Sequence, residues 1–325
     1  MYQGTQSKDR RVMQKIQLYC PGANDHREAL PLYGHPLLKK EWFPSFPGVF
    51  EFCEKHFAYN LATDSIMIFP GPLGHEKYDM EGTYEYYEKN RGKRTIYAFT
   101  YNAIDRNFPD PDIGENDFYF EDIISYQTSM YKSERKKNQF PFPPLIDDYF
   151  ENQYYRGPIS IFWRGNHKFN RILPLSVIES TKYKKDFTIT PIGSEFIGNN
   201  KKLFLNKMTD NLFSFCIRGG ANFCRRFYET LMMGRIPILF QSDRCFIFED
   251  YGIDLNDVCV VLEFDTEFGV NIFDKESLVK KFEEKIDSWI STHDVDLIQR
   301  QNREIWEKYC SPLGFLKNFY STLKA

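Results

Sequence analysis

The sequence predicts an α/β protein of two domains, each with a sheet of mainly parallel strands. The chain has 325 residues, more than one minimal core requires and enough for two domains of ordinary size. Hydrophobic residues make up 42% of the chain, which is ample material for two cores. Short apolar runs alternate with segments of helical periodicity, and this alternation is typical of parallel strands joined by right-handed crossover helices.

The first half of the chain shows this alternation after an irregular start. Residues 1–45 carry many Pro, Gly and charged residues and predict an irregular arm. The basic, then Pro-rich stretch 131–144 predicts a linker or a long connection, and its Lys-rich run 133–137 predicts a solvated linker. Between them the expected elements are strands at 65–70, 95–100 and 118–126 and a short helix at 80–89.

A second series of elements begins near residue 158, so we expect a first domain at 1–150 and a second at 151–300. The expected strands are 159–163, 186–191, 212–217, 236–240 and 258–263. The expected helices are 170–180, 223–233, 275–291 and 294–309.

Composition excludes several classes of protein. The formal net charge of −3 argues against a general nucleic-acid binder, which needs an excess of Lys and Arg. The seven cysteines are scattered singly and show no metal-ligand spacing with His, which indicates reduced thiols and no zinc site. The first residues lack the apolar core of a signal peptide, and no apolar run is long enough to span a membrane. We therefore expect a cytoplasmic protein with no transmembrane segment.

Residues 211–243 carry the clearest functional pattern. A buried strand runs into Arg218, Gly219 and Gly220, and a helix begins near Asn222. Ligands of open α/β sheets bind at the carboxyl ends of the strands, where a helix N-terminus offers unpaired N–H groups and the positive end of its dipole. Glycines let a phosphate approach the backbone. The pattern predicts a phosphate site.

Basic and acidic residues on the helix extend this prediction. Arg225 and Arg226 lie in the first turn, where the helix dipole disfavours a cation unless an anion binds there. They therefore indicate a diphosphate held by charge-assisted hydrogen bonds. Glu229 lies one turn further along the same face and can accept hydrogen bonds from two ribose hydroxyls. Spacing alone fits equally well an ion pair between Arg226 and Glu229 of little energetic value.

The segment resembles the C-terminal signature of the exostosin-like glycosyltransferases, family 47. The family pattern is Arg-Gly, then Ser-x-Arg-x-x-Glu-Ala, then Gly-x-Ile-Pro-Val. Cys224 stands at the usual Ser and Thr230 at the usual Ala, and both are small. The residues of this chain that match the C-terminal signature are Arg218-Gly219, Cys224-Arg225-Arg226, Glu229-Thr230 and Gly234-Arg235-Ile236-Pro237-Ile238. A separate, weaker resemblance to the family covers residues 159–171.

The resemblance implies a GT-B type fold, in which two Rossmann-like domains face a cleft. It also implies inverting transfer of a sugar from a nucleotide diphosphate sugar, most often UDP-linked, to a glycan or glycoprotein acceptor, without a cofactor. Residues 301–325 would form a helix that returns to the first domain. A catalytically silent carbohydrate- or nucleotide-binding module stays open, because an intact donor signature does not establish turnover. The donor-binding residues would be Arg164, Arg171, Arg218, Gly219, Gly220, Asn222, Arg226 and Glu229.

Inversion by single displacement needs a general base near the acceptor hydroxyl and stabilisation of the leaving diphosphate. Arg226 would supply the stabilisation. For the base we favour Asp105, which follows the strand at 95–100, and then His75, which follows the strand at 65–70 with Glu76 and Asp79.

Two Asp-x-Asp triplets, at 110–112 and 294–296, resemble the cation-binding triplet of the other large glycosyltransferase architecture. We expect neither to bind metal. The first lies in a Pro-rich loop and the second opens a helix, where acidic residues serve as caps.

Overall fold

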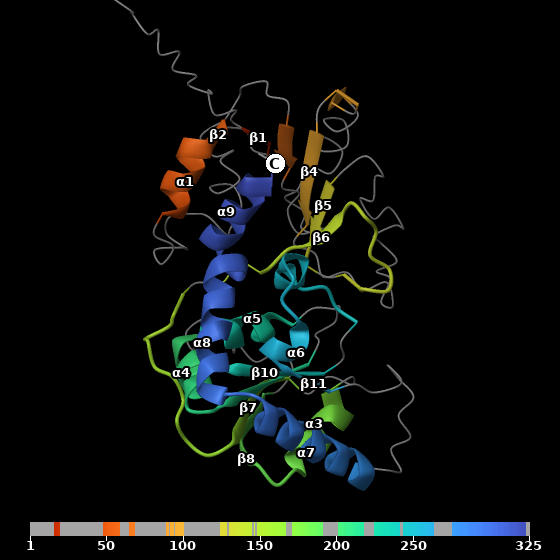
Figure 1. Ribbon diagram of the computed structural model, residues 1–325, viewed down its shortest axis with the longest axis vertical. Coiled ribbons are helices and arrows are strands. Elements are labelled where there is room, and N and C mark those ends of the chain that lie inside the picture. The colour runs from red at the N-terminus through yellow and green to blue at the C-terminus, as the bar shows by residue number, and fades with distance from the viewer. Residues whose placement is uncertain are drawn as a thin grey trace, which may run out of the picture. The chain divides into compact units, whose positions relative to one another are not determined.

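The structure is a computed structural model in which the chain forms two compact units, residues 1–99 with 120–124 and residues 100–119 with 125–325. Figure 1 shows its helices and strands. The residues that it describes are 16–19, 48–58, 65–68, 89–90, 92–93, 95–100, 124–128, 130–144, 146, 148–166, 171–190, 201–217, 224–240, 243–262 and 275–322.

The smaller unit contains parallel strands in the order β2-β1-β3-β4. Its elements are β1 (Ile16–Tyr19), α1 (Val49–His56), β2 (Phe57–Ala58), β3 (Ser65–Ile68) and β4 (Thr95–Thr100). Strands β3 and β4 confirm two predicted strands. The prediction of an irregular arm is wrong at β1, which pairs with both β2 and β3. Most of the predicted helix 80–89 lies outside the described residues.

The larger unit contains a five-stranded parallel sheet in the order β11-β10-β9-β7-β8. Its strands are β7 (Ser160–Asn166), β8 (Lys184–Thr190), β9 (Phe213–Cys216), β10 (Ile236–Phe240) and β11 (Val260–Leu262). Two further strands precede it in the chain and pair in parallel with each other, β5 (Ile124–Gln127) and β6 (Gln139–Pro141). The parallel strands and the helices between them confirm the α/β fold class.

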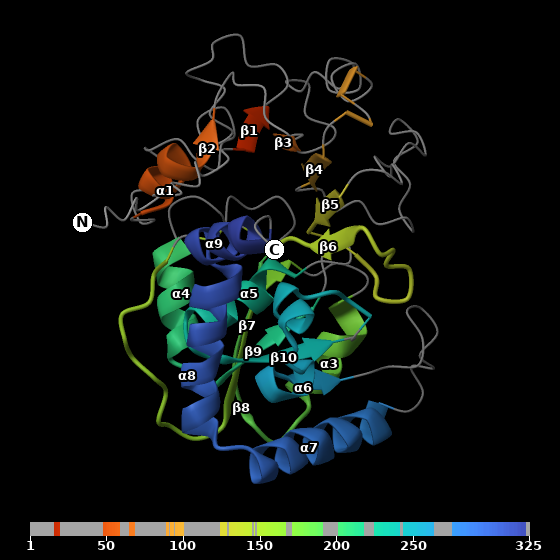
Figure 2. The ribbon, with the colours of Figure 1, turned by 45° about the horizontal axis from the view of Figure 1, so that its top comes forward.

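Helices connect the strands of this sheet and cover it (Figures 1 and 2). The crossover helices are α3 (Ile172–Glu179), α4 (Lys201–Thr209), α5 (Arg225–Met232) and α6 (Leu255–Val258), with a 3₁₀ turn at Ile247–Tyr251 and a long helix α7 (Lys275–Thr292) afterwards. Neighbouring residues of β7 face opposite sides of the sheet, as the period of a strand requires. Trp163 lies in the core with Phe282 of α7, whereas Phe162 contacts Phe204 of α4. Helix α4, the 3₁₀ turn and helix α6 are elements of this series that we did not expect.

The chain continues through α8 (Val295–Ile305), a π-helical turn (Trp306–Cys310) and α9 (Pro312–Thr322). Phe315 and Phe319 of α9 contact the ring of Tyr126, and Phe315 also contacts Phe142. These contacts group residues 125–150 with the C-terminal sheet and helices. The predicted domain limits of 1–150, 151–300 and 301–325 stay predictions.

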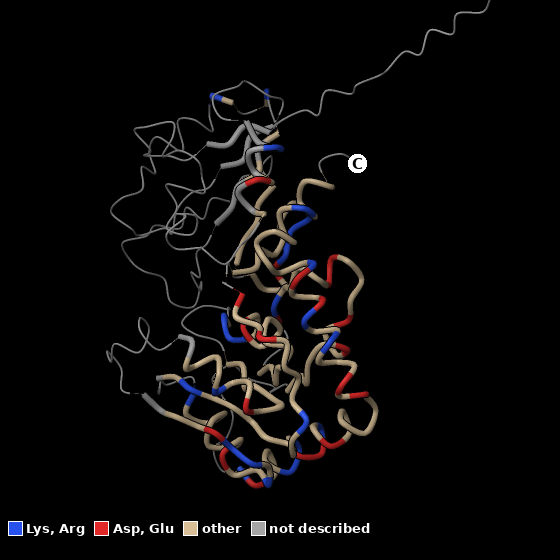
Figure 3. The backbone as a smooth tube through the Cα atoms, turned by 90° about the vertical axis from the view of Figure 1, so that its left-hand side faces the viewer, with Lys and Arg blue, Asp and Glu red and all other residues tan. Residues whose placement is uncertain are grey.

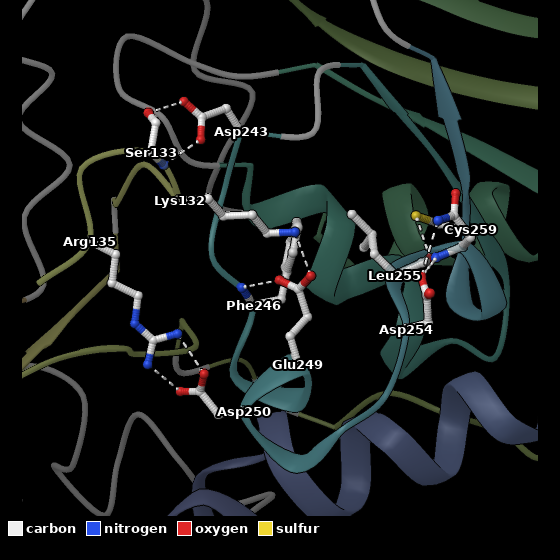
Figure 4. Close-up of polar contacts among 11 residues, drawn as sticks. Lys132, Ser133, Arg135, Asp243, Phe246, Glu249, Asp250, Asp254, Leu255 and Cys259 are labelled. Atoms are coloured by element: carbon white, nitrogen blue, oxygen red, sulfur yellow. Dashed lines mark hydrogen bonds and ion pairs between the residues drawn. The ribbon is translucent and has the colours of Figure 1, made fainter. Parts of the chain in front are cut away.

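The stretch 131–144 is anchored to the segment that follows β10, so the prediction of a solvated linker at 133–137 is wrong (Figure 4). Arg135 donates to both carboxylate oxygens of Asp250, at 2.5 and 2.9 Å. Lys132 pairs with Glu249 at 2.5 Å, and Ser133 donates from its backbone N–H and its hydroxyl to Asp243. Sequence reading missed these contacts because the partners lie more than 100 residues away along the chain.

Basic and acidic residues are interspersed along the described backbone of the larger unit (Figure 3). None of the helices in the described part of the chain is long and apolar enough to cross a bilayer.

Candidate anion-binding site

The strand order of the larger unit identifies where a ligand is expected. Numbered along the chain from β7, the strands lie in the order 5-4-3-1-2. The chain goes from β7 to its neighbour β8 on one side, and then crosses back to β9, which is the neighbour of β7 on the other side. In doubly wound sheets the crevice outside the carboxyl ends of two such strands is the usual ligand site. Here it lies between β7 and β9, whose carboxyl ends carry Arg164 and Phe215.

Arg226 lies at this point and bridges the two strands. Its two terminal nitrogens donate to the backbone carbonyls of Phe215, at 3.4 Å, and of Arg164. Its guanidinium lies 5.5 Å from the ring centroid of Trp163 and 5.6 Å from that of Phe204. A Cβ at Gly165 would lie 3.1 Å from the Trp163 ring, so glycine there permits this close packing. The sequence order alone did not predict that Arg226 joins β7 to β9.

Three buried donors at the site have no hydrogen-bond acceptor among the described residues. They are the Nε groups of Arg164 and Arg226 and the indole N–H of Trp163. A guanidinium offers five N–H groups in a planar fork. The carbonyls of Phe215 and Arg164 accept from only some of the N–H groups of Arg226. A buried N–H group without an acceptor costs free energy, so these donors indicate a ligand rather than a finished structural contact.

Arg171 adds a third cation. It is the N-cap residue of α3, and its pKa is lowered first by burial and then by the positive charge of Arg226. The two like charges are therefore near each other in a partly desolvated place. No acidic residue lies in the first turn of α3 or α5, nor in that of α4 or α9, whereas α1, α6, α7 and α8 each carry one there. Two helix N-termini with arginines and no carboxylate favour a bound anion.

Arg235 shows what a structural buried arginine in this chain looks like. It is 1% exposed, and its nitrogens donate to the carbonyls of Thr209, Gln153, Met233 and Gly234. Burial lowers its pKa to about 10. Its Nε, Nη1 and Nη2 all have acceptors, unlike those of Arg164 and Arg226.

Glu229 lies on the second turn of α5 and is 8% exposed. Its carboxylate accepts a hydrogen bond at 3.2 Å from the Nε of Arg225, one turn earlier. The alternative of an ion pair between Arg226 and Glu229 is therefore wrong, because the neighbouring arginine is the partner.

Sequence reading missed Arg244. Arg244 is 3% exposed, donates to the carbonyl of Phe240 at 3.3 Å, and lies near Cys224, whose pKa its charge lowers. It follows the carboxyl end of β10 by four residues. Applying the carboxyl-end rule to that strand as well as to β9 would have found it.

The structure brings together Arg164, Arg171 and Arg226 and places Glu229 further along α5. Asp294 accepts hydrogen bonds from the N–H groups of Asp296 and Leu297, which confirms its expected role as a helix cap. Across the described ranges no cluster of three or more His, Cys, Asp or Glu could hold a metal ion. Of the other sequence-predicted residues, those outside the described residues are His75, Glu76, Asp79, Asp105, Asp110, Asp112, Arg218, Gly219, Gly220 and Asn222.

No family model matches the chain, and no curated protein matches it. Solved structures that resemble it include TarM, at 9% identity and a TM-score of 0.44 over 80% of this chain and 55% of TarM. Another is the apo form of the lipopolysaccharide outer core galactosyltransferase WaaB, at 11% identity and a TM-score of 0.49 over 95% of this chain and 99% of WaaB. A third is the pneumococcal O-GlcNAc transferase GtfA in complex with UDP and GlcNAc, at 8% identity and a TM-score of 0.42, covering 80% of this chain and 57% of GtfA. At these TM-scores the likeness carries no functional argument, so the function proposed next rests on the residues of this chain.

Proposed function

We propose that this chain is an inverting glycosyltransferase of the exostosin-like kind, with a GT-B arrangement of its domains. It would transfer a sugar from a nucleotide diphosphate sugar, UDP-linked, to a glycan or glycoprotein acceptor. The observation that carries the proposal is the group of cations at the β7/β9 switch point. There the Nε donors of Arg164 and Arg226 are buried without an acceptor in the described part of the chain, beside Arg171.

The charge of this group fits a diphosphate better than a single carboxylate. Several guanidinium groups and the N-termini of α3 and α5 together can neutralise more than one negative charge. As the bond from sugar to diphosphate breaks, negative charge develops on the leaving oxygen. Donors already oriented toward that position stabilise the transition state without further reorganisation. This is the role we assign to Arg226, with Arg164 and Arg171 holding the donor.

The connection between β9 and α5 completes the donor site in this proposal. Arg218 would add positive charge, and Gly219, Gly220 and Asn222 would let the diphosphate approach backbone N–H groups. Glu229 would accept hydrogen bonds from the ribose hydroxyls, while its Oε1 also accepts the hydrogen bond from Arg225.

The acceptor hydroxyl must lose a proton during a single displacement. We propose Asp105 as the base and His75 as the alternative. No metal is needed, because the arginines already supply the positive charge that a divalent cation would supply.

A screen of donor turnover tests the function directly. Purified protein is incubated with a panel of UDP- and GDP-sugars without acceptor, and release of the nucleotide diphosphate is measured. We expect hydrolysis of a UDP-sugar, inversion at the anomeric carbon by NMR, and loss of both in Asp105→Asn. Binding of UDP with no turnover of any donor would instead support a silent binding module. Failure to bind either nucleotide would contradict both.

A further inference from the structure

Arg244 is a buried cation at the carboxyl end of β10, the strand next to β9 in the sheet. Its Nη2 donates to the carbonyl of Phe240, the last residue of β10, at 3.3 Å. Leu239 of β10 pairs with Cys216, the last residue of β9, so the two strands end within one residue of each other. Arg244 therefore lies at the same edge of the sheet as Arg226, on the β10 side of β9.

The chain around Arg244 packs on the first half of α5. Phe246 lies two residues further along, and its ring centroid is 4.3 Å from that of Phe227, in the first turn of α5. Arg244 also lies near Cys224, the N-cap residue of α5. It thus adds positive charge beside the helix N-terminus that the site presents to an anion.

The two residues that flank Arg244 are both held by the segment that follows β5 (Figure 4). Asp243 accepts hydrogen bonds from the backbone N–H of Ser133, at 3.0 Å, and from its hydroxyl, at 2.7 Å. On the other side, the N–H of Cys245 donates to the carbonyl of Met130 at 3.3 Å. The backbone of Arg244 is therefore fixed from both sides, which lowers the entropy lost when its long side chain binds a ligand.

Two ion pairs reinforce this attachment. Lys132 pairs with Glu249, and Arg135 donates to both carboxylate oxygens of Asp250. All four side chains are partly exposed, and ion pairs of this kind contribute little to global stability. Their position next to the chain around Arg244 indicates a local purpose, which is to hold that chain in place.

Arg244 also increases the density of positive charge at the site. Arg171 and Arg226 lie near Cys224 as well, so three guanidinium groups surround the start of α5. Like charges withdrawn from water repel one another and cost free energy unless an anion neutralises them. The arrangement fits an anion with several negative charges.

We propose that Arg244 is a further ligand of the diphosphate that the site binds, and that Ser133 and Asp243 are positioning residues for it. Arg244 holds the anion from the β10 side of β9, and Arg226 holds it from the β7 side. The planar fork of Arg244 gives two parallel N–H groups to phosphate oxygens, which an ammonium group cannot do. That the diphosphate belongs to a nucleotide sugar rests on the proposed function.

Calorimetric titration of the full-length protein with inorganic pyrophosphate and with UDP tests the ligand role. Arg244→Gln should bind both about 10–100-fold more weakly than wild type, the loss expected for one charged hydrogen-bond donor. Arg244→Lys keeps the charge without the fork and should lie between the two. Arg300→Gln, the same change at an exposed arginine of α8, should bind like wild type. A folded Arg244→Gln variant with wild-type affinity for both probes would overturn the proposal.

The positioning role has a test that leaves the buried arginine in place. Ser133 is exposed, so Ser133→Ala should melt near the wild-type temperature. It should weaken pyrophosphate binding by about 2–10-fold, the cost of ordering one long side chain on binding. Ser133→Thr keeps the hydroxyl and should restore the affinity. Wild-type affinity in Ser133→Ala would contradict the positioning role.

A double variant distinguishes positioning of Arg244 from a general structural effect. If Ser133 acts through Arg244, Ser133→Ala should weaken binding no further in Arg244→Gln. The same further loss in both backgrounds would contradict that path. Should Arg244→Gln melt far below wild type, Arg244→Lys replaces it in this comparison, with a correspondingly smaller effect of Ser133→Ala expected than in wild type.

The two probes separate this proposal from the function on which its last step rests. Binding of pyrophosphate that depends on Arg244, without binding of UDP, would contradict the nucleotide donor and leave the anion ligand standing. UDP binding that Arg244→Gln leaves unchanged would overturn the role of Arg244 and leave the donor site standing. Binding of neither probe by wild type would contradict both.

Discussion

Buried guanidinium groups serve two purposes in this chain, and the difference lies in where their donors go. Arg235 satisfies its donors with the backbone carbonyls of Thr209, Gln153, Met233 and Gly234 and is a structural residue. Arg226 bonds two carbonyls and keeps a buried Nε without an acceptor in the described residues. An arginine that is both a structural bridge and a ligand group should show both effects when it is removed.

Replacing Arg226 should therefore change stability and catalysis together. Arg226→Ala loses two hydrogen bonds to the ends of β7 and β9, and we expect the unfolding free energy to fall by about 1–3 kcal/mol. We also expect kcat to fall and not only KM to rise, because the charge is assigned to the leaving diphosphate. Urea unfolding and steady-state kinetics measure the two effects. An increase in KM alone would make Arg226 a uniform binder and direct attention to Arg218.

Glu229 and its partner allow a paired test of ribose binding. Glu229→Ala should weaken UDP binding by about 1.5–3 kcal/mol, as expected for loss of a charged hydrogen-bond partner. Arg225→Ala removes the same ion pair but leaves the carboxylate, and Arg225 is 45% exposed, so its effect should be well under that. Calorimetry measures both affinities. Equal effects in the two variants would show that Glu229 acts only as the partner of Arg225.

At the level of elements, the strands around the site could be predicted from the sequence and several other elements could not. Continuous apolar runs identified β7, β9 and β10, because strands buried on both faces carry them. β1 has four residues and is defined by its partners β2 and β3, which sequence periodicity does not reveal. α4 did carry a signal that we missed, since Phe204, Leu205 and Met208 fit one helical face.

An ion pair outside the site tests how the C-terminal helices are held. Arg303 of α8 donates to both carboxylate oxygens of Asp148, at 2.8 and 2.6 Å. Its guanidinium lies 4.6 Å from the ring centroid of Phe150 and 4.8 Å from that of Trp306. Asp148→Asn removes one of the carboxylates that pair with Arg303, whose side chain is only 8% exposed. We expect a loss of about 1–3 kcal/mol in unfolding free energy.

The second carboxylate partner of Arg303 is the matched control. Glu307 pairs with it at 2.7 Å but is 54% exposed. Glu307→Gln should therefore cost less than about 1 kcal/mol. Denaturant unfolding measures the unfolding free energy of both variants. A larger loss of stability in Glu307→Gln than in Asp148→Asn would contradict the greater contribution that we assign to the Asp148 pair.

For the whole molecule, the fold class could be predicted from the alternation of strands and helices. The arrangement of the site could not, because it depends on the order of the strands in the sheet. The sequence brought Arg218 and Arg226 together because they flank one turn, and grouped Arg164 and Arg171 with them only through a family resemblance. That Arg226 bridges β7 and β9 depends on those strands being neighbours, which no local pattern specifies.

The absence of a metal requirement is a prediction about the whole enzyme. Sugar transfer should persist in excess EDTA, because arginines supply the positive charge at the diphosphate, and Asp112→Asn should be close to wild type. Activity assays with and without manganese measure this. A collapse of the rate in EDTA that manganese alone restores would contradict the GT-B arrangement.

Calorimetric titration of UDP tests the central claim most directly. Wild type is compared with Arg171→Ala and with Arg300→Ala, an equal change at an exposed arginine of α8 whose guanidinium lies 5.9 Å from the ring centroid of Tyr154. We predict that wild type and Arg300→Ala bind UDP alike and that Arg171→Ala binds about 10–100-fold more weakly, the loss expected for one charged hydrogen-bond donor. Equal affinities in all three proteins, or no binding by wild type, would contradict a diphosphate site at the β7/β9 switch point.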